Sequence, residues 1–558
     1  MSDAAWLVHE LGFTGPPGNL EEAYVRERLN AHPVAELHAY VLALVASSVA
    51  ADASYLKIQN DSDDFILLRD GRTPSEEDLQ GLFSQLFRHA ASPERRYLVD
   101  LAVGLNGSLA LNPKSVILET TGHRYQLLPL SHKLEPLKAS PFQDPRATFR
   151  IHVKEPRRLM KLVKYVTGFP PEGELIQKHC LYATPKITVN GVAINRKVDL
   201  GRCVVSSRWN RPGVPMPGES VVPGSIARDG TAPGPFASCL GLGRPSEEFR
   251  LLYMADGLAF PDPTPDLPFV ELRGLVSCPG LRRRLDQTGL IEDEAWSALI
   301  EQLRVQVIEM AETAASRFEE LDAQTQLTAA SILEQLADLA AQNGQLERAR
   351  GLLTRVVATR ERAMRPDDPR LTETFLKLAR WLGELDQLEE AARVYRRVLP
   401  HLDAQAQHHL SRRNMSQAYE ILENALNVHE KIAPPGDPAL GKRAFDLAEM
   451  LRSEQATRAE TLYYRALHLR EEALGSDHPE VGVTLLALAE LNRLQRDWKG
   501  AEGYARRALD IAERHWSRDG KALFPYLHMM SEVLKGMGEY GASLEFSERA
   551  LMAKHGRL

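Results

Sequence analysis

Apolar residues change their spacing near residue 290 of this 558-residue chain. Beyond that point Gly and Pro become rare, and apolar residues recur three and four positions apart, which is the spacing of amphipathic helices. Residues 1–280 instead mix short alternating stretches, turns and short helical patterns. The pattern predicts an α+β N-terminal half and an all-α C-terminal half, with a long connecting helix over 286–322.

The helical half is repetitive. Its repeats align on one alanine each, and these alanines are Ala349, Ala391, Ala418, Ala459, Ala501 and Ala542. The spacings between them are 42, 27, 41, 42 and 41 residues. Each repeat is predicted to be two helices that cross at the alanine, because a bulky side chain there would force them apart. The 27-residue step predicts a shortened or distorted third repeat.

Residues 459–513 resemble the tetratricopeptide repeats of kinesin light chains, whose repeats are joined by a loop of the form LG-x-DHP. Here the loop reads LGSDHP, over 474–479. The resemblance extends over about 320–556 and implies a repeat solenoid at 323–558. In this family the first helices line a groove that binds a peptide or another protein. The alternatives are that the array forms a homodimer or braces the N-terminal half.

The N-terminal half begins with a series of elements that local patterns define. Ser75 has the acidic residues after it that are typical of a helix N-cap. A small-residue stretch contains a predicted glycine turn. The expected elements are a helix at 35–54, strands at 55–59 and 65–68, a helix at 75–87, the glycine turn within 98–111, and a hairpin at 114–130.

That order resembles the ATP-binding fold of the GHKL group, which includes DNA gyrase B, MutL, histidine kinases and a heat-shock chaperone. The stretch ALVASSVAADA, residues 43–53, matches the apolar positions of the family's first helix. The resemblance covers about 20–135 and implies a GHKL-like α/β sandwich domain at 1–140. Residues 141–285 resemble the start of the transducer domain that follows the ATPase in this group.

The catalytic side chains of the group are missing. The overlay puts Ala43 at the family's catalytic Glu and Ser47 at its magnesium-binding Asn. A methyl group cannot act as a general base, and losing one slows catalysis by roughly 100-fold to 10,000-fold. A single hydroxyl is a poor substitute for a magnesium ligand. The resemblance therefore implies a pseudo-ATPase.

Nucleotide binding without hydrolysis is still implied by the resemblance. Its candidate residues for ATP or ADP, with Mg²⁺, are Ser47, Asp70, Gly71, Gly104 and Gly107. Asp70 and Gly71 match the adenine-reading turn when the overlay is shifted by one residue; without the shift, Arg69 takes the place of the Asp. Gly104 and Gly107 match the lid whose backbone amides approach the phosphates. The alternative is that the Asp70–Gly71 turn and the pair Gly104 and Gly107 have a purely structural role.

A working, chaperone-like ATPase is the rival hypothesis. It needs a catalytic acid outside the standard position. Glu36 lies about two helical turns before Ala43. Glu21 and Glu22 are the other candidates.

Two further stretches have unusual composition. Residues 209–245 are so rich in Pro and Gly that a long irregular loop or insertion is predicted. A basic helix carries Arg157, Arg158, Lys161 and Lys164. It is predicted to be a solvated face, with nucleic acid or anionic lipid as the alternative ligand.

Net charge and cysteine usage narrow the classes of function. A net charge of -7 gives no overall attraction to nucleic acid. The four cysteines form no zinc or C-x-x-C spacing, the N-terminus is not a signal peptide, and the longest apolar run is too short to cross a membrane. The sequence therefore predicts a cytoplasmic protein-interaction scaffold with a pseudo-ATPase domain, and no membrane or nucleic-acid partner.

Overall fold

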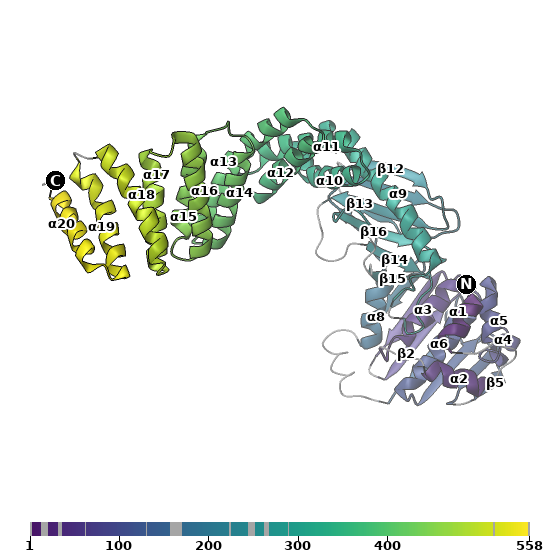
Figure 1. Ribbon diagram of the computed structural model, residues 1–558. Coiled ribbons are helices and arrows are strands. Elements are labelled where there is room, and N and C mark those ends of the chain that lie inside the picture. Colours follow the sequence, from purple (N-terminus) through teal and green to yellow (C-terminus); the bar gives the residue numbers. More distant parts are fainter. Residues whose placement is uncertain are drawn as a thin grey trace. The chain divides into compact units, whose positions relative to one another are not determined.

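The computed structural model divides the chain into two compact units, Met1–Leu336 and Ala337–Leu558 (Figure 1). We call them the N-terminal and C-terminal units and describe each by itself. The order of elements confirms a mixed α/β region followed by an all-helical array. The structure describes residues 3–12, 21–31, 36–61, 63–129, 131–156, 170–221, 225–243, 251–261, 267–287, 289–516 and 519–555.

An eight-stranded sheet forms the first layer of the N-terminal unit, in the order β5-β4-β3-β6-β2-β1-β7-β8. Neighbouring strands are antiparallel except β1 and β7, which are parallel. Buried and more exposed residues alternate along β2 and β6, as expected of a sheet covered on one face. The strands are β1 Tyr55–Asn60, β2 Asp64–Arg69, β3 Ser115–Thr120, β4 His123–Leu127, β5 His132–Pro136, β6 Phe149–Lys154, β7 Lys186–Val189 and β8 Val192–Ala193.

Helices α3 and α6 pack against each other beside this sheet (Figure 1). The ring of Tyr40 in α3 meets Phe65 of β2 edge-on, with centroids 5.8 Å apart. The helices are α1 Asp3–Glu10, α2 Glu22–Ala31, α3 Tyr40–Ala50, α4 Glu76–Gln80, α5 Leu86–Ala91, α6 Arg96–Ser108 and α8 Pro171–His179, with short 3-10 turns at Pro93–Arg95 and Leu109–Leu111.

The predicted helix over 75–87 is wrong in extent, because α4 ends at Gln80 and α5 begins at Leu86. Its start is confirmed: the Ser75 hydroxyl accepts the amide of Asp78, whose carboxylate accepts the amide of Ser75, a complete capping box. The helix predicted at 35–54 is shorter than expected, since α3 spans Tyr40–Ala50.

The predicted glycine turn is also wrong. Gly104 and Gly107 lie inside helix α6. A Cβ on Gly104 would lie 2.5 Å from Cδ2 of Leu44, and one on Gly107 would lie 3.2 Å from Cβ of Tyr40. The two glycines therefore allow α6 to approach α3 closely.

A second, six-stranded sheet follows, in the order β12-β10-β13-β16-β14-β15. The loop predicted at 209–245 is wrong, because β12 and β13 fall within it. Gly243 in this stretch serves close approach: a Cβ there would lie 2.5 Å from the carbonyl oxygen of Arg202. The strands are β10 Cys203–Asn210, β12 Ile226–Thr231, β13 Ala237–Gly243, β14 Leu251–Ala255, β15 Leu258–Pro261 and β16 Leu272–Ser277, beside a two-stranded sheet of β9 Val198–Gly201 and β11 Glu219–Val221.

A long helix lies within the stretch where one was predicted, but it is shorter than 286–322: α9 spans Glu294–Ser316. Its buried Gln306 accepts a hydrogen bond from Ser238 at 2.8 Å and donates one to Ser207 at 2.9 Å, which fixes α9 to the second sheet. The basic stretch with Arg157, Arg158, Lys161 and Lys164 lies outside the described residues.

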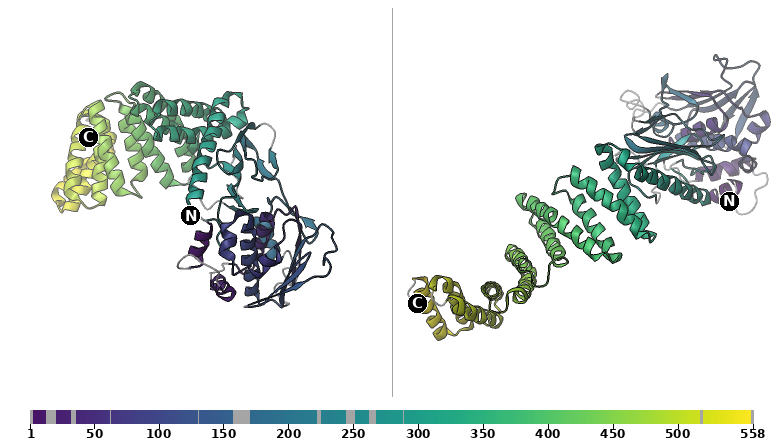
Figure 2. Two further views of the ribbon diagram at one scale, coloured as in Figure 1. Left: turned by 90° about the vertical axis from the view of Figure 1, so that its right-hand side faces the viewer. Right: turned by 90° about the horizontal axis from the view of Figure 1, so that it is seen from above.

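The helical array is built from successive antiparallel pairs (Figure 2). We call the two members of a pair its first and second helix, and number the repeats 1 to 6. The helices are α10 Ala323–Gln342, α11 Leu346–Ala363, α12 Pro369–Glu384, α13 Leu388–Ser411, α14 Met415–Glu430, α15 Pro438–Leu451, α16 Ala456–Leu474, α17 Pro479–Leu494, α18 Trp498–Trp516, α19 Gly520–Met537 and α20 Tyr540–Lys554, with a 3-10 turn at Phe318–Glu320 before them.

Small buried residues mark every helix crossing. The predicted positions are confirmed in repeats 1 to 5, but Ala542 is wrong by one residue. The backbone N–H of Ser543 donates to the carbonyl of the first residue after the turn, as the N–H of Ala501 does in repeat 5, so the two positions are equivalent. Ser543, and not Ala542, is the buried residue. The second-helix residues are Ala349, Ala391, Ala418, Ala459, Ala501 and Ser543, and the first-helix residues are Ala337, Ala379, Ala406, Ala448, Ala489 and Ser531.

The 27-residue step has a simple structural cause. Ala391 and Ala406 both lie in α13, a helix of 24 residues. This helix is the second helix of repeat 2 and continues, through Pro400, as the first helix of repeat 3. The third repeat therefore keeps both helices and lacks the loop before them.

Gly520, the first residue of α19, packs against the end of α20 and provides a stability test. A Cβ on Gly520 would lie 2.8 Å from the backbone oxygen of Ala553. We expect Gly520→Ala to lower the free energy of unfolding by about 1–3 kcal/mol, because the backbone of α20 must move. The control is Gly503→Ala in α18, where nothing lies within 4 Å; it should raise stability by about 0.5–1 kcal/mol. Urea unfolding measures both, and equal effects would contradict the packing.

Candidate functional site

The two positions at the heart of the predicted nucleotide pocket are packed inside the N-terminal unit. The Ser47 hydroxyl donates to the carbonyl of Tyr97 at 2.8 Å, and Ser47 is buried. Ala43 is buried and lines a cavity of about 50 Å³ together with Tyr40 and Gln287. A cavity of this volume holds a few waters and is much smaller than the roughly 300–1,000 Å³ of typical small-molecule sites.

Asp70 and Gly71 form the turn that ties the end of β2 to the end of α3. The Asp70 carboxylate accepts the Ser54 amide at 2.7 Å and the Tyr55 amide at 3.3 Å. Burial alone would raise the pKa of Asp70, but the hydrogen bonds from Ser54 and Tyr55 outweigh it and lower the pKa. Gly71 has φ +83, and a Cβ there would lie 2.6 Å from the oxygen of Ala51. These contacts are those of a structural turn.

Arg69, the residue that the unshifted overlay puts at the adenine-reading Asp, fills the space beneath this turn. Its guanidinium carbon lies 4.0 Å from the ring centre of Phe149, and Nη1 donates to the carbonyls of Asp70 and Arg72. Arg69 is fully buried, and burial lowers its pKa to about 10. The Arg69 guanidinium therefore occupies the space beneath the Asp70–Gly71 turn.

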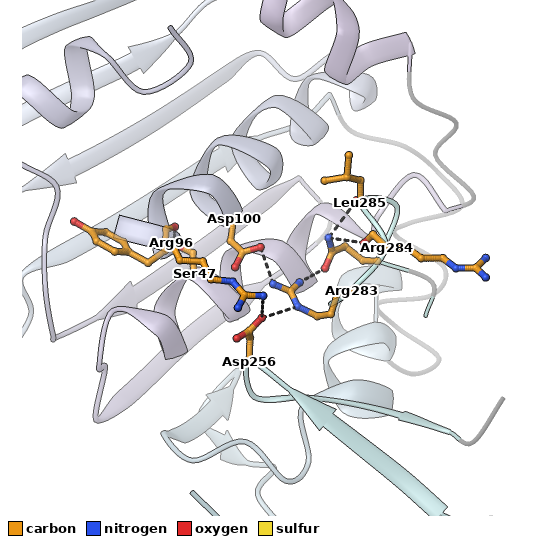
Figure 3. Close-up of polar contacts among 9 residues, drawn as sticks. Ser47, Arg96, Asp100, Asp256, Arg283, Arg284 and Leu285 are labelled. Carbon is orange, nitrogen blue, oxygen red and sulfur yellow. Dashed lines mark hydrogen bonds and ion pairs between the residues drawn. The ribbon is translucent and has the colours of Figure 1, made fainter. Parts of the chain in front are cut away.

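One buried charged cluster of the N-terminal unit was not predicted from the sequence. Figure 3 shows the guanidinium of Arg283 between the carboxylates of Asp100 and Asp256. Arg283 donates to Asp100 Oδ1 at 2.6 Å and to Asp256 Oδ2 at 3.2 Å, and Arg96 donates to the same Asp256 oxygen at 3.3 Å. Gln287 accepts a further bond from Arg283. We call these residues the Arg283 cluster.

The Arg283 cluster joins three parts of the N-terminal unit. Asp100 lies in α6, Asp256 in the turn between β14 and β15, and Arg283 in the segment after β16. Burial raises the pKa of Asp100, and Arg283 opposes that rise. Burial alone would lower the pKa of Arg283, but Asp100 and Asp256 outweigh it and raise the pKa. Two carboxylates therefore balance two guanidinium groups, and the cluster is neutral.

The segment that carries Arg283 also fills the space beside α3 and α6. Leu285 and Gln287 line both the 50 Å³ cavity near Ala43 and a second cavity of about 40 Å³ near Asp100.

The acids proposed for a working ATPase are either paired with a basic side chain or exposed. Glu22 in α2 accepts a bond from Arg26 at 3.3 Å and lies 2.7 Å from Nδ1 of His132. Glu36 and Glu21 are exposed outside helix α3.

A row of ion pairs lies on the first helices of repeats 4 to 6. Each carboxylate follows the small crossing residue by one position, and each cation follows it by four, so that the pair spans one helical turn. The nitrogen-to-oxygen distances are 3.7, 2.8 and 4.0 Å for Glu449–Arg452, Glu490–Arg493 and Glu532–Lys535. We call these six residues the first-helix face.

Charges of neighbouring repeats interact on the first-helix face. A hydrogen bond from Arg493 lowers the pKa of Glu490, and Arg452 of the preceding repeat and His528 of the following repeat lower it further. The side chains are 27–63% exposed. The face is therefore a solvent-accessible row of alternating charges.

A different set of ion pairs joins the second helices of neighbouring repeats. Each arginine lies six residues after the small crossing residue of its own repeat. Its glutamate partner lies in the preceding repeat, twelve residues after the small crossing residue of that repeat. The pairs are Arg397–Glu361, Arg465–Glu430, Arg507–Glu471 and Arg549–Glu513. Their regular placement supports Ser543 as the crossing residue of repeat 6.

Comparisons with known proteins agree with the helical array. A family model described as tetratricopeptide repeat matches residues 328–404 and 444–514. The C-terminal part of the chain therefore contains tetratricopeptide repeats, which generally bind other proteins or peptides. None of the curated proteins matches the chain. Among the helices of the described residues, none is both long and apolar enough to cross a membrane.

Solved structures of similar repeats include TPR-like repeats of a Podosopora anserina protein described as a kinesin light chain. It is 19% identical, with 40% of this chain and 93% of that chain covered and a TM-score of 0.24. BtubC (BKLC) from P. vanneervenii is also 19% identical, with 47% of this chain and 92% of that chain covered and a TM-score of 0.23.

The Arg283 cluster makes a prediction about stability. Arg283→Met leaves Asp100 buried beside a second carboxylate, so we expect a loss of about 3–5 kcal/mol in the free energy of unfolding. The neighbouring Arg282 is the control, because its pair with Asp293 at 3.1 Å is partly solvated; Arg282→Met should cost about 0–1 kcal/mol. Urea unfolding with hydrogen exchange of the α6 amides measures the difference. Similar losses in both variants would show that the cluster does not hold α6.

Proposed function

We propose that this chain is a non-catalytic protein-interaction scaffold whose repeats bind a peptide or helix of a partner protein at the first-helix face. The observation that carries the proposal is the row of exposed, alternating ion pairs Glu449–Arg452, Glu490–Arg493 and Glu532–Lys535 on tetratricopeptide repeats.

The first-helix face suits a polypeptide ligand for two reasons. Its charges of both signs are already ordered by their pairs, so binding immobilises few additional rotamers. Partly buried or exposed apolar side chains, including Phe445, Leu486 and Val483, lie on the same helices. Apolar contacts supply affinity, and the alternating charges set the register of the ligand.

The N-terminal unit acts in this proposal as a folded platform without catalysis. Its candidate nucleotide residues are engaged in the fold: Ser47 bonds to Tyr97, Asp70 holds a turn, and Gly104 and Gly107 lie in a helix contact. The pseudo-ATPase hypothesis is therefore carried by the family resemblance, and the packing around Ala43 opposes it.

We also propose that the scaffold works in the cytoplasm. Cys180, Cys203, Cys239 and Cys278 are buried and form no disulfide. Thiols in this state fit a reducing compartment.

Peptides selected from a random phage-displayed library on the purified chain test the binding face. The variant E490R/R493E exchanges the two charges of one pair, so the pair and the net charge are kept while the pattern is reversed. We expect the affinity of selected peptides, measured by fluorescence anisotropy, to fall about tenfold, equivalent to about 1.4 kcal/mol.

The matched control is E502R/R506E, which exchanges a pair of similar geometry on the second helix α18. Peptide affinity should stay unchanged there. If both exchanges weaken binding equally, or if neither does, the first-helix face is not the binding site.

Calorimetry with ATP and ADP, with and without Mg²⁺, tests whether the N-terminal unit binds a nucleotide. We expect no saturable heat, because the cavity beside Ala43, which Leu285 and Gln287 help to line, has a volume of only about 50 Å³. Saturable binding that Ser47→Ala or Asp70→Ala weakens would restore the pseudo-ATPase. Mg²⁺-dependent release of phosphate that Glu36→Ala abolishes would establish the working enzyme instead.

A further inference from the structure

Two buried carboxylates and a histidine meet at one edge of the eight-stranded sheet. Glu155 and Glu172 are both 0% exposed, and the side chain of His38 is 18% exposed. His38 Nδ1 lies 2.8 Å from Glu172 Oε1. One nitrogen or oxygen atom from each of the three side chains lies within 4.8 Å of the other two. We call these three residues the His38 cluster.

The sheet explains why Glu155 lies at the same edge as Asn60. Strands β1 and β6 both pair antiparallel with β2, so they run in the same direction and end at the same edge. Buried residues alternate with more exposed ones along β6, and Glu155, one position past its end, keeps the buried phase. Asn60, the last residue of β1, is also buried. Two polar side chains thus take positions where a sheet covered on one face usually has apolar ones.

Helices α3 and α8 bring the other two members of the cluster to this edge. Figure 1 shows α8 beside α3, and the two helices are in contact. His38 lies in the turn before α3, and Glu172 is the second residue of α8. Glu172 shares the buried face of α8 with Leu175, Ile176 and His179. Three separate segments of the N-terminal unit therefore each contribute one side chain.

Two buried oxygens beside the His38 cluster indicate a ligand. Asn60 is 1% exposed and its amide nitrogen donates to Glu172 Oε2 at 3.4 Å, whereas its Oδ1 accepts no hydrogen bond from the described residues. The hydroxyl of Tyr40, which is 4% exposed, also has no hydrogen-bond partner within the described ranges. Burial raises the pKa of Tyr40, and Glu172 and Glu155 raise it further, so this hydroxyl lies near both carboxylates. A buried polar atom without a partner is costly, and a bound group that supplies one removes that cost.

We propose that the His38 cluster binds one zinc ion, through Nδ1 of His38 and one carboxylate oxygen each of Glu155 and Glu172, with a water as the fourth ligand. Zinc binds imidazole and carboxylate at about 2.0–2.2 Å, so its ligand atoms lie roughly 3–3.5 Å apart. Small side-chain movements bring the three residues to that spacing. The imidazole favours zinc over Mg²⁺ and Ca²⁺, which prefer oxygen ligands alone.

Charge and hydrogen bonding both suit an ion at this buried place. The charges of two carboxylates and one Zn²⁺ sum to zero, as a buried ionic group requires. The zinc-bound water has two hydrogens, which it can donate to Asn60 Oδ1 and to the Tyr40 hydroxyl oxygen. Because both carboxylates are fully buried, we assign the ion a structural role: it fastens α8 and the turn before α3 to the end of the sheet.

Zinc binding to the purified full chain tests the site. After removal of metal with a chelator and dialysis against zinc, the wild type should retain one zinc ion per chain, measured by mass spectrometry of the metal. Titration against a chromophoric chelator gives the affinity. Glu155→Gln keeps the shape of the side chain and removes its charge, and His38→Gln removes the nitrogen ligand at a partly exposed position. Each should weaken zinc binding by about 100-fold or more, since losing even an outer partner of a ligand costs roughly 10–100-fold.

His132→Gln is the matched control. Nδ1 of His132 lies 2.7 Å from Glu22 Oε2, nearly the same contact as that of His38. Among the residues that the structure describes, however, this pair belongs to no group of three side chains that could hold a metal ion. Zinc affinity should therefore be unchanged in His132→Gln.

Stability and spectroscopy provide independent readouts. Zinc should raise the urea midpoint of the wild type in a concentration-dependent way, because an ion that binds only the folded chain stabilises it; Glu155→Gln should not respond. The cobalt form should lack thiolate-to-metal absorption, since the proposed ligands are nitrogen and oxygen.

Three results would overturn the zinc site. The first is a wild type that retains no zinc, as expected if basic side chains neutralise these carboxylates instead. The second is wild-type zinc affinity in both Glu155→Gln and His38→Gln. The third is binding of Mg²⁺ or Ca²⁺ as tight as that of zinc. None of these results depends on peptide binding at the first-helix face.

Discussion

Close approach between helices is the constraint on which both parts of this molecule depend. Two helices can cross at short range only where the side chains at the contact are small. In the N-terminal unit Gly104 and Gly107 give α6 its path along α3. In the array an alanine or serine from each helix meets at every crossing, from Ala337 and Ala349 to Ser531 and Ser543. The small residues that look in the sequence like a nucleotide-binding helix and a glycine lid are therefore also what tight helix packing requires.

The Arg283 cluster then decides what the packed N-terminal unit can do. A guanidinium buried between two carboxylates is stable only if its partners stay in place, because an unpaired charge in that position is costly. Arg283 therefore fixes α6, the β14–β15 turn and the segment after β16 to one another, and it carries Leu285 and Gln287 into the space beside Ala43. The same interaction that holds the fold together thus places chain atoms beside Ala43, where the cavity is about 50 Å³. We assign recognition to the repeats because tetratricopeptide repeats generally bind other proteins or peptides.

Local signals made much of the fold predictable, and distant contacts made the rest unpredictable. The strands around Phe65, the N-cap at Ser75 and the period of the array follow from neighbouring residues, and all were predicted. The pairing of Arg283 with Asp100 joins residues 183 positions apart, for which a single sequence has no signal. Glycine was the main source of error: Gly243 marks close backbone approach within a sheet, and Gly104 and Gly107 in α6 mark a helix contact. Both contexts have the composition of a loop.

The two kinds of ion pair in the array explain how it can be both rigid and able to bind. Pairs between second helices, such as Arg507–Glu471, connect neighbouring repeats, so breaking one would loosen the junction. Pairs on the first helices, such as Glu490–Arg493, lie within one helix. A ligand that takes over one member of such a pair leaves every junction intact, and the released partner stays solvated at small cost. Charges that a ligand can take over without breaking a junction thus lie on the first helices of repeats 4 to 6.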